Sequence, residues 1–256
     1  MSKLSIVPPR EPAPLADDLT LAALRAEIDG VDDEILQLVL HRQRLAGRIG
    51  AAKGQSDNQV SSLKLRPDRE ARVIARRLER VEPSERRLAT ALWRELMSAG
   101  LSIQGQLEVA VWSGARKDVR EAARSRFGGC ADYKDYRLAS DALNAALEMD
   151  GVAVLALDNE DPWWTSLLER KDLWVFEGVG RRGPMDPAAL AVGKLDPTVL
   201  AHGVVYRVST GGDSGMEGHS ERVLAVSEGR RLCVQRDHGG PLDRDRGIVG
   251  CAAVLG

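Results

Sequence analysis

An apolar stripe in the first fifth of the chain constrains the fold more than any other feature of the sequence. Its members recur at steps of three, four and seven residues, as on one face of a helix: Leu24, Ile28, Val31, Ile35, Leu38, Leu45 and Ile49. A helix from Asp18 to Lys53 would be roughly 54 Å long at 1.5 Å per residue. Such a helix cannot bury its stripe within about 90 residues of chain. We therefore expect it to pack on a second copy, as a homodimer.

Two shorter helices are predicted after this long one. Pro67 begins the first, with Asp68 and Glu70 in the opening turn, where carboxylates suit the helix dipole. The second runs from Pro83 to about residue 106. We expect residues 17–107 to form a helical domain, preceded by a proline-rich flexible leader over residues 1–16.

The pattern changes after residue 107. Short apolar runs alternate with helical patterns and glycine-rich turns, which is typical of a mixed α/β fold. We expect strands at 107–112, 152–157, 173–176, 204–208, 222–226 and 232–234, and a last buried strand in the tail GIVGCAAVLG. The predicted fold class is α + α/β: a three-helix domain that forms a dimeric helical bundle, followed by a smaller, binding-protein-like α/β domain over 108–256.

One glycine motif in this half has a simpler explanation than a cofactor site. Gly178, Gly180 and Gly183 spell GxGxxG after an apolar run. A dinucleotide-binding fingerprint must open a helix, but Pro184 and Pro187 would interrupt a helix at this position. We predict a turn here.

Composition excludes several classes of function. Lys and Arg number 36 against 38 Asp and Glu, so the net charge of −2 gives no basic field for nucleic acid or an anionic membrane. No apolar run reaches the ~18 residues of a membrane span, and the N-terminus lacks an apolar signal core. Three cysteines are too few and too scattered for a disulfide framework or a zinc site. We expect a cytoplasmic protein with no metal and no cofactor.

Four polar residues fall on or beside the apolar faces of the predicted helices. Arg42 and Lys53 occupy the stripe itself, while Glu70 and Gln104 lie next to the inner faces of the two shorter helices. Burying an unpaired cation costs several kcal/mol, so each cation needs a partner. The surplus positive charge suits a small dianion. Two alternatives stay open: the cations extend into solvent at the rim of a coiled coil, or the helices bind a partner protein.

Four separated motifs match one family in order and spacing. They are LRxxID from Leu24, RxxLAxxIGxxK from Arg42, DRE from Asp68, and the late glutamine Gln104. Residues 19–107 thereby resemble the all-helical chorismate mutases. The resemblance implies a three-helix chain intertwined as a dimer with two composite sites. It also implies the isomerisation of chorismate to prephenate in aromatic amino acid biosynthesis.

The resemblance implies a role for each matching residue. Arg25 would reach across the dimer into the neighbour's site, and Arg42 would bind a substrate carboxylate. Lys53 would contact a carboxylate and the ether oxygen, to which Gln104 would also donate. The rearrangement transfers no proton and needs no nucleophile, so clamping the carboxylates and stabilising charge on that oxygen suffice for catalysis.

Arg69 and Glu70 match the family's Arg-Glu pair, whose glutamate holds the ring hydroxyl. With Lys53, Gln104 and Arg42, Glu70 completes the expected catalytic set. Two positions depart from the pattern. Arg66 stands where an acidic residue often precedes the pair by three, and Gly100 removes a side-chain contact one turn before Gln104.

The second half carries a weaker resemblance. The stretches EVAVWSGARKDVREAARSRFGG and ASDALNAALEMDGVAVLALDN resemble the start of a prephenate dehydratase domain. That family's Thr-Arg-Phe motif is missing. Ser125-Arg126-Phe127 resembles it, but we expect this triplet to lie in the first helix of this half, which is the wrong place for the motif. We expect a degenerate lobe for stability, dimer contacts or regulation. The alternatives to a monofunctional mutase are a bifunctional mutase/dehydratase, an isochorismate pyruvate lyase, and a non-catalytic helical regulatory or binding module.

Overall fold

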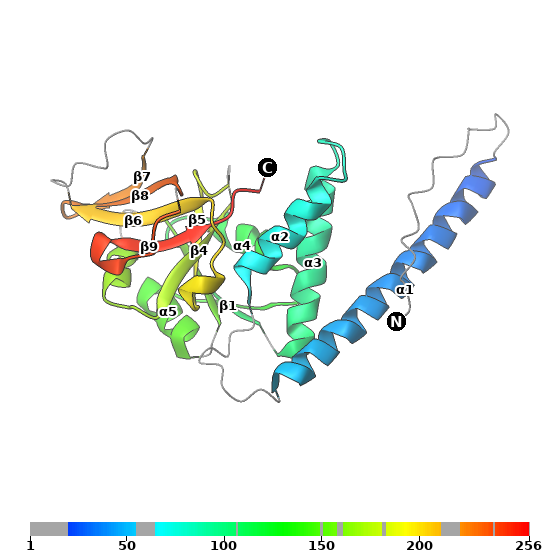
Figure 1. Cartoon of the computed structure of the whole chain (residues 1–256), viewed down its shortest axis with the longest axis horizontal. Coiled ribbons are helices and arrows are strands. Elements are labelled where there is room, and N and C mark those ends of the chain that lie inside the picture. Colours follow the sequence, from blue (N-terminus) through cyan, green and yellow to red (C-terminus); the bar gives the residue numbers. More distant parts are fainter. Residues whose placement is uncertain are drawn as a thin grey trace. The chain divides into compact units, whose positions relative to one another are not determined.

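The computed structural model describes residues 20–54, 65–105, 107–148, 151–157, 161–180, 183–210, 221–237 and 239–255 (Figure 1). Contacts divide the chain into two compact units, residues 1–44 and residues 45–256. The leader expected over residues 1–16 lies outside the described residues. Among the described residues, no helix is both long enough and apolar enough to cross a membrane.

Helix α1 (Leu21–Gly54) confirms the long helix that the stripe predicts. Its first turn is capped by Thr20, whose hydroxyl oxygen accepts the backbone N–H of Ala23 at 3.3 Å. All seven stripe residues are exposed, with exposed fractions between 39% and 69%. A helix of 34 residues therefore presents a long apolar face, interrupted at Arg42, that the described part of the single chain leaves open to solvent.

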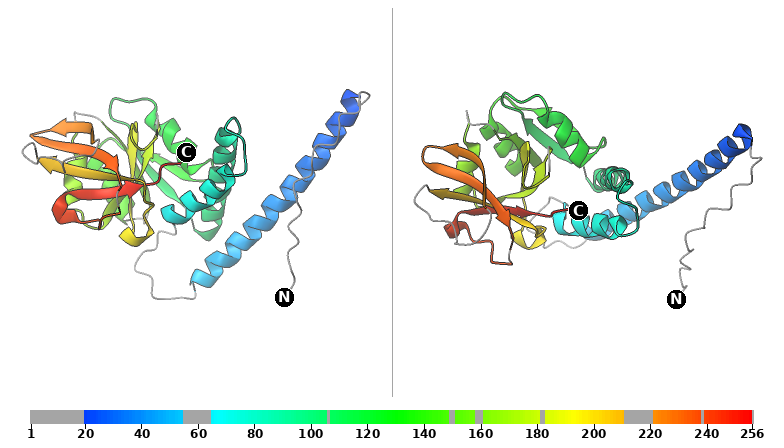
Figure 2. Two further views of the ribbon diagram at one scale, coloured as in Figure 1. Left: turned by 45° about the horizontal axis from the view of Figure 1, so that its top comes forward. Right: turned by 90° about the horizontal axis from the view of Figure 1, so that it is seen from above.

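Helices α2 (Pro67–Leu78) and α3 (Arg86–Gln104) lie side by side in the second unit (Figure 2). Proline at the first position of α2 is tolerated because the N–H that it lacks has no partner inside a helix. Buried Ile74 and Leu78 form the inner face of α2. Helix α3 begins at Arg86 rather than at the predicted Pro83, because residues 82–85 form a turn instead.

The α/β part is built on a mixed sheet. Its strands are β1 (Glu108–Trp112), β2 (Asp132–Asp135), β3 (Val152–Ala156), β4 (Leu173–Val179), β5 (Ala189–Lys194), β6 (Val204–Thr210), β7 (Arg222–Ser227), β8 (Arg230–Arg236) and β9 (Ile248–Ala252). Within the described residues they form one nine-stranded sheet in the order β2-β1-β3-β5-β4-β9-β6-β8-β7. Strand β1 runs parallel to β2 and β3, and β4 runs parallel to β9. The remaining neighbours are antiparallel.

Helices α4 (Val119–Phe127) and α5 (Ala139–Glu148) connect the first three strands and pack on the sheet. Three short 3₁₀ helices, η1 (Trp163–Leu168), η2 (Pro197–Val199) and η3 (Arg244–Arg246), complete the α/β part. The buried core runs through the sheet and both helices and includes the two tryptophans of η1. Contrary to expectation, this part is larger than the helical part, because 108–256 holds more residues than 17–107.

The strand predictions are confirmed for all six apolar runs and for the tail. Two strands were not predicted. Strand β2, with the sequence DYKD, is polar because it lies at the edge of the sheet, and β5 is rich in Ala and Gly, which have weak strand propensity. The turn prediction is confirmed only in part for the GxGxxG segment. Gly178 lies within β4, which ends at Val179, whereas Gly180 and Gly183 have φ values of 76° and 90° and come before strand β5.

The three cysteines should differ sharply in reactivity. Cys130 is exposed, whereas Cys233 and Cys251 are buried. Burial raises the pKa of the Cys251 thiol to about 12 and also raises that of Cys233. The thiolate is the reactive form, so a thiol reagent at pH 8 should label Cys130 alone in the folded chain and all three cysteines in denaturant. Peptide mass spectrometry checks this; fast labelling of Cys251 in the folded chain would contradict the burial.

Candidate active site

The end of α1 and the end of α3 meet closely in the second unit. A Cβ added at Gly50 would lie 2.9 Å from Cγ of Gln104 and 3.3 Å from its Cα. One turn earlier, a Cβ at Gly47 would lie 3.3 Å from Cγ2 of Ile103. Two glycines on one helix face thus let the backbones of α1 and α3 approach each other. This contact fixes where Gln104 lies relative to the end of α1.

Lys53 follows Gly50 by three residues on α1, so its backbone lies at the same helix end as Gln104. The side chain of Lys53 lies outside the described residues. The Gln104 side chain is half-buried, and its Nε2 donates to the carbonyl oxygen of Gly100 at 3.0 Å. Two residues expected to donate to one ether oxygen are therefore positioned by adjoining helix ends.

Glu70 takes part in a buried ion-pair cluster that sequence reasoning did not anticipate. Nη2 of Arg126, on α4, donates to its Oε2 at 2.9 Å, and the side chains of Arg126 and Glu70 are only 9% and 12% exposed. Nε of Arg126 lies 3.1 Å from Oε2 of Glu177 on β4. Nη2 of Arg94, on α3, lies 3.4 Å from the other oxygen of Glu177. Four elements thus contribute two cations and two carboxylates to this Arg–Glu cluster.

The two guanidinium groups of the Arg–Glu cluster differ in how well their charge is compensated. Burial acts to lower the pKa of Arg126, but the carboxylates of Glu177 and Glu70 outweigh it and raise the pKa above the ordinary value. For Arg94, burial and then the nearby charge of Arg126 lower the pKa. A cleft of about 330 Å³ borders the cluster and is lined by Arg94, Arg126 and Glu177 together with residues after β4.

Three further residues were predicted for the site: Arg25, Arg42 and Arg69. Arg69 is exposed on α2. Arg25 is exposed and Arg42 half-buried, and both belong to the first unit. Within the described part of the chain, no group of three or more His, Cys, Asp or Glu side chains has the arrangement of a metal site. The structure thus brings Gln104 to the helix end that carries Lys53, and places Glu70 against the α/β part.

Comparison with known protein families assigns the helical region. Residues 24–105 match the chorismate mutase type II family. This region is a chorismate mutase type II domain. The matched span includes the whole length of α2 and α3 and most of α1, and it contains every site residue expected from the sequence.

Curated relatives extend the similarity only in part. A bifunctional chorismate mutase/prephenate dehydratase of Aquifex aeolicus is 33% identical over 120 residues, which cover 44% of this chain and 32% of that protein. A protein of the same description from Pseudomonas aeruginosa is 31% identical over 116 residues, with the same coverage. The chain thus spans about a third of the length of these relatives. No solved structure matches it.

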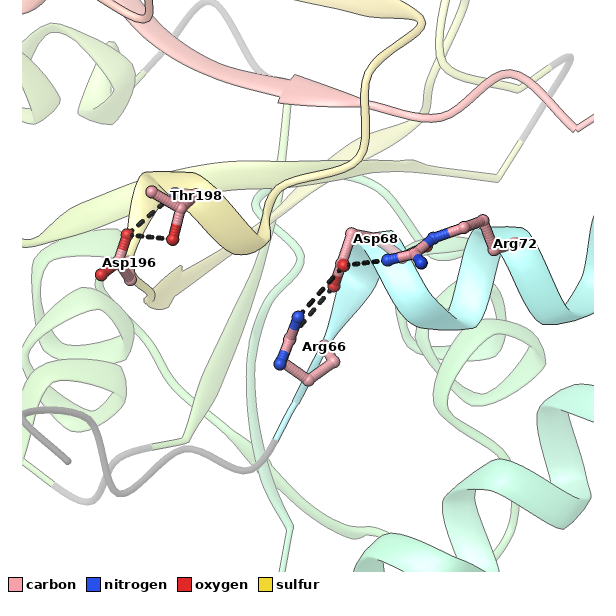
Figure 3. Close-up of polar contacts among 5 residues, drawn as sticks. All are labelled: Arg66, Asp68, Arg72, Asp196 and Thr198. Atoms are coloured by element: carbon pink, nitrogen blue, oxygen red, sulfur yellow. Dashed lines mark hydrogen bonds and ion pairs between the residues drawn. The ribbon is translucent and has the colours of Figure 1, made fainter.

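Arg66, which stands where the family often has an acidic residue, forms an ion pair within the mutase domain. Arg66 pairs with Asp68 in the first turn of α2, with Nε 3.1 Å from Oδ1, and Arg72 pairs with the same carboxylate at 2.5 Å (Figure 3). Burial acts to raise the pKa of Asp68, but Arg66 and Arg72 lower it overall. Figure 3 also shows Asp196, whose carboxylate accepts hydrogen bonds from the backbone N–H and the hydroxyl of Thr198 at the start of η2. The guanidinium of Arg66 is therefore engaged by Asp68.

Three residues of the Arg–Glu cluster, Arg94, Arg126 and Glu177, were missed from the sequence. For Glu177 a signal existed, since it is a charge within the otherwise buried strand LWVFEGV. Arg126 belongs to the triplet Ser125-Arg126-Phe127, whose place in α4 is confirmed. Arg94 lies in the same helix as the exposed Arg86 and Arg87, and nothing in its spacing sets it apart from them.

Proposed function

We propose that this chain is a chorismate mutase that isomerises chorismate to prephenate. The observation that carries the proposal is the match of residues 24–105, combined with the close approach of Gly50 and Gln104. That approach supports a shared role for Lys53 and Gln104 as donors to the ether oxygen. Donors of this kind act more strongly on the charge of the transition state than on the substrate.

The substrate would be held by its two carboxylates. Arg42 and Lys53 would bind them within one subunit, and Arg25 would reach across from the other. Arg69 would contribute to substrate binding as the arginine of the Arg-Glu pair, and Glu70 would accept a hydrogen bond from the ring hydroxyl. This role for Glu70 is compatible with its pairing to Arg126, because a carboxylate has about four acceptor positions and the pair uses one oxygen.

A homodimer is part of the proposal. The exposed stripe on α1 is long, with Arg42 as an interruption, and extended apolar surface of this kind favours association. A second copy of α1 would cover the stripe of the first in a symmetric interface. The same arrangement would carry Arg25 of each chain toward the neighbour's Lys53 and Gln104, which makes the site composite.

Product analysis of the full-length chain tests the proposal and separates its alternatives. The chain is incubated with chorismate and, in a parallel reaction, with isochorismate. The loss of chorismate absorbance is followed in the first reaction. Phenylpyruvate that forms only after acid treatment identifies prephenate and supports a monofunctional mutase. Phenylpyruvate without acid would show a bifunctional enzyme. Salicylate and pyruvate from isochorismate would show a lyase, and no turnover of either substrate would leave a binding module; these last two results would overturn the proposal.

A further inference from the structure

The Arg–Glu cluster links the mutase domain to the α/β part through a residue that the proposed function leaves without a role. Arg126 lies between Glu70 of α2 and Glu177 of β4, at 2.9 and 3.1 Å. Its guanidinium also lies 4.9 Å from the ring centre of Phe127. A buried arginine with two carboxylate partners has little freedom to move, since any rotation leaves buried charge unpaired.

We propose that Arg126 is a positioning residue for Glu70, so that the α/β part supplies a component of the mutase site. The inference rests on the proposed function and deepens it. A glutamate side chain has several rotamers, and holding one of them in place costs side-chain entropy. The bond from Arg126 holds Glu70 Oε2 in advance, which leaves the carboxylate oriented to accept the substrate hydroxyl.

Independent contacts fix α4 against α3, which the positioning role requires. The backbone N–H of Gly129 donates to Oε2 of Glu95 at 2.8 Å, and the hydroxyl of Ser102 donates to the carbonyl oxygen of Cys130 at 2.9 Å. At Gly128, where φ is 75°, an added Cβ would lie 2.7 Å from both Glu95 Oε2 and Ser98 Cβ. The segment just after Arg126 is therefore held on α3, and Arg126 keeps its place relative to the mutase domain.

The second carboxylate keeps Arg126 itself in position. Oε2 of Glu177 lies 3.1 Å from Nε of the guanidinium as an ion-pair partner, while Oε2 of Glu70 accepts a hydrogen bond from Nη2, so carboxylates hold the group from two directions. Glu177 is anchored in β4, in the middle of the sheet order. The rigid sheet thus determines, through Arg126, where the carboxylate of Glu70 lies.

The test compares Arg126→Met and Arg126→Lys with Arg124→Met in the full-length chain. Arg124 lies on the same helix and is exposed, so its variant controls for loss of one arginine from α4. We expect Arg126→Met to lower kcat/KM for chorismate by about tenfold or more, as for loss of a charged hydrogen bond. Arg126→Lys should recover part of this loss, and Arg124→Met should match the parent chain. Thermal unfolding establishes that each variant is folded.

A double-mutant cycle with Glu70→Gln separates positioning from general stability. If Arg126 acts through Glu70, adding Arg126→Met to Glu70→Gln costs little further activity. If the two losses multiply, or if Arg126→Met is as active as the parent chain, the positioning role is wrong. Should Arg126→Met fail to fold, the same cycle with Arg126→Lys decides. A parent chain without mutase turnover would instead overturn the proposed function, so the two failures are distinguishable.

Discussion

Replacing Lys53 by alanine should lower kcat/KM for chorismate by about 10²–10³-fold, the usual cost of removing one donor to a developing oxyanion. Its ammonium group is expected to hold a carboxylate and the breaking ether oxygen together. No other residue expected at the site can supply both contacts, so the loss should appear mainly in kcat. Arg42→Ala should have an effect of similar size through loss of the carboxylate clamp. Steady-state kinetics with chorismate measures both variants.

Arg48→Ala is the matched control for these two variants, since Arg48 is an exposed cation of the same helix α1. It should keep the activity of the parent chain. Far-ultraviolet circular dichroism should show unchanged helix content for all three variants, because exposed or rim positions of a long helix tolerate alanine. If Lys53→Ala or Arg42→Ala keeps nearly full turnover, the roles assigned to these residues are wrong.

Replacing Gly50 by alanine should lower turnover by about 10–100-fold, because misplacing catalytic groups by about 1 Å is costly. The new Cβ would meet Gln104 at 2.9 Å (Cγ) and 3.3 Å (Cα), and the Cα cannot move aside by rotation. The ends of α1 and α3 must then separate, which moves Lys53 away from Gln104. The measurement is kcat and KM for chorismate.

Gly30→Ala is the control for this variant. Gly30 lies on the same helix, and an added Cβ there would have nothing within 4 Å. Alanine is favoured over glycine within a helix by about 1 kcal/mol, so Gly30→Ala should stabilise the chain and leave turnover unchanged. The Gly50 variant should combine unchanged or higher helix content with loss of activity. Full activity of Gly50→Ala would show that the approach of α1 to α3 does not position the site.

Much of the fold was predictable from the sequence, because burial patterns are local. The steps of three and four in the stripe predict α1, and the proline at position 67 predicts where α2 begins. Apolar runs predict the buried strands for the same reason. The edge strand β2 was missed because an edge needs no apolar pattern.

The candidate site was predictable only as a set of residues. Spacing along a helix shows that Arg42, Lys53 and Glu70 share faces with apolar residues, but not what each of them contacts. Glu70 pairs with Arg126, 56 positions away, and this pair depends on how α4 packs against α3. Such a pair between distant segments leaves no periodic pattern in the chain.

Mixing two inactive variants tests the central claim, which is that each site combines residues of two chains. Arg25→Ala and Lys53→Ala should each be strongly impaired alone. After subunit exchange, half of the dimers are mixed, and in each mixed dimer one site has both residues intact. The mixture should therefore recover about one quarter of the parent activity. A mixture as inactive as its two components would contradict a composite site and, with it, the proposed dimeric mutase.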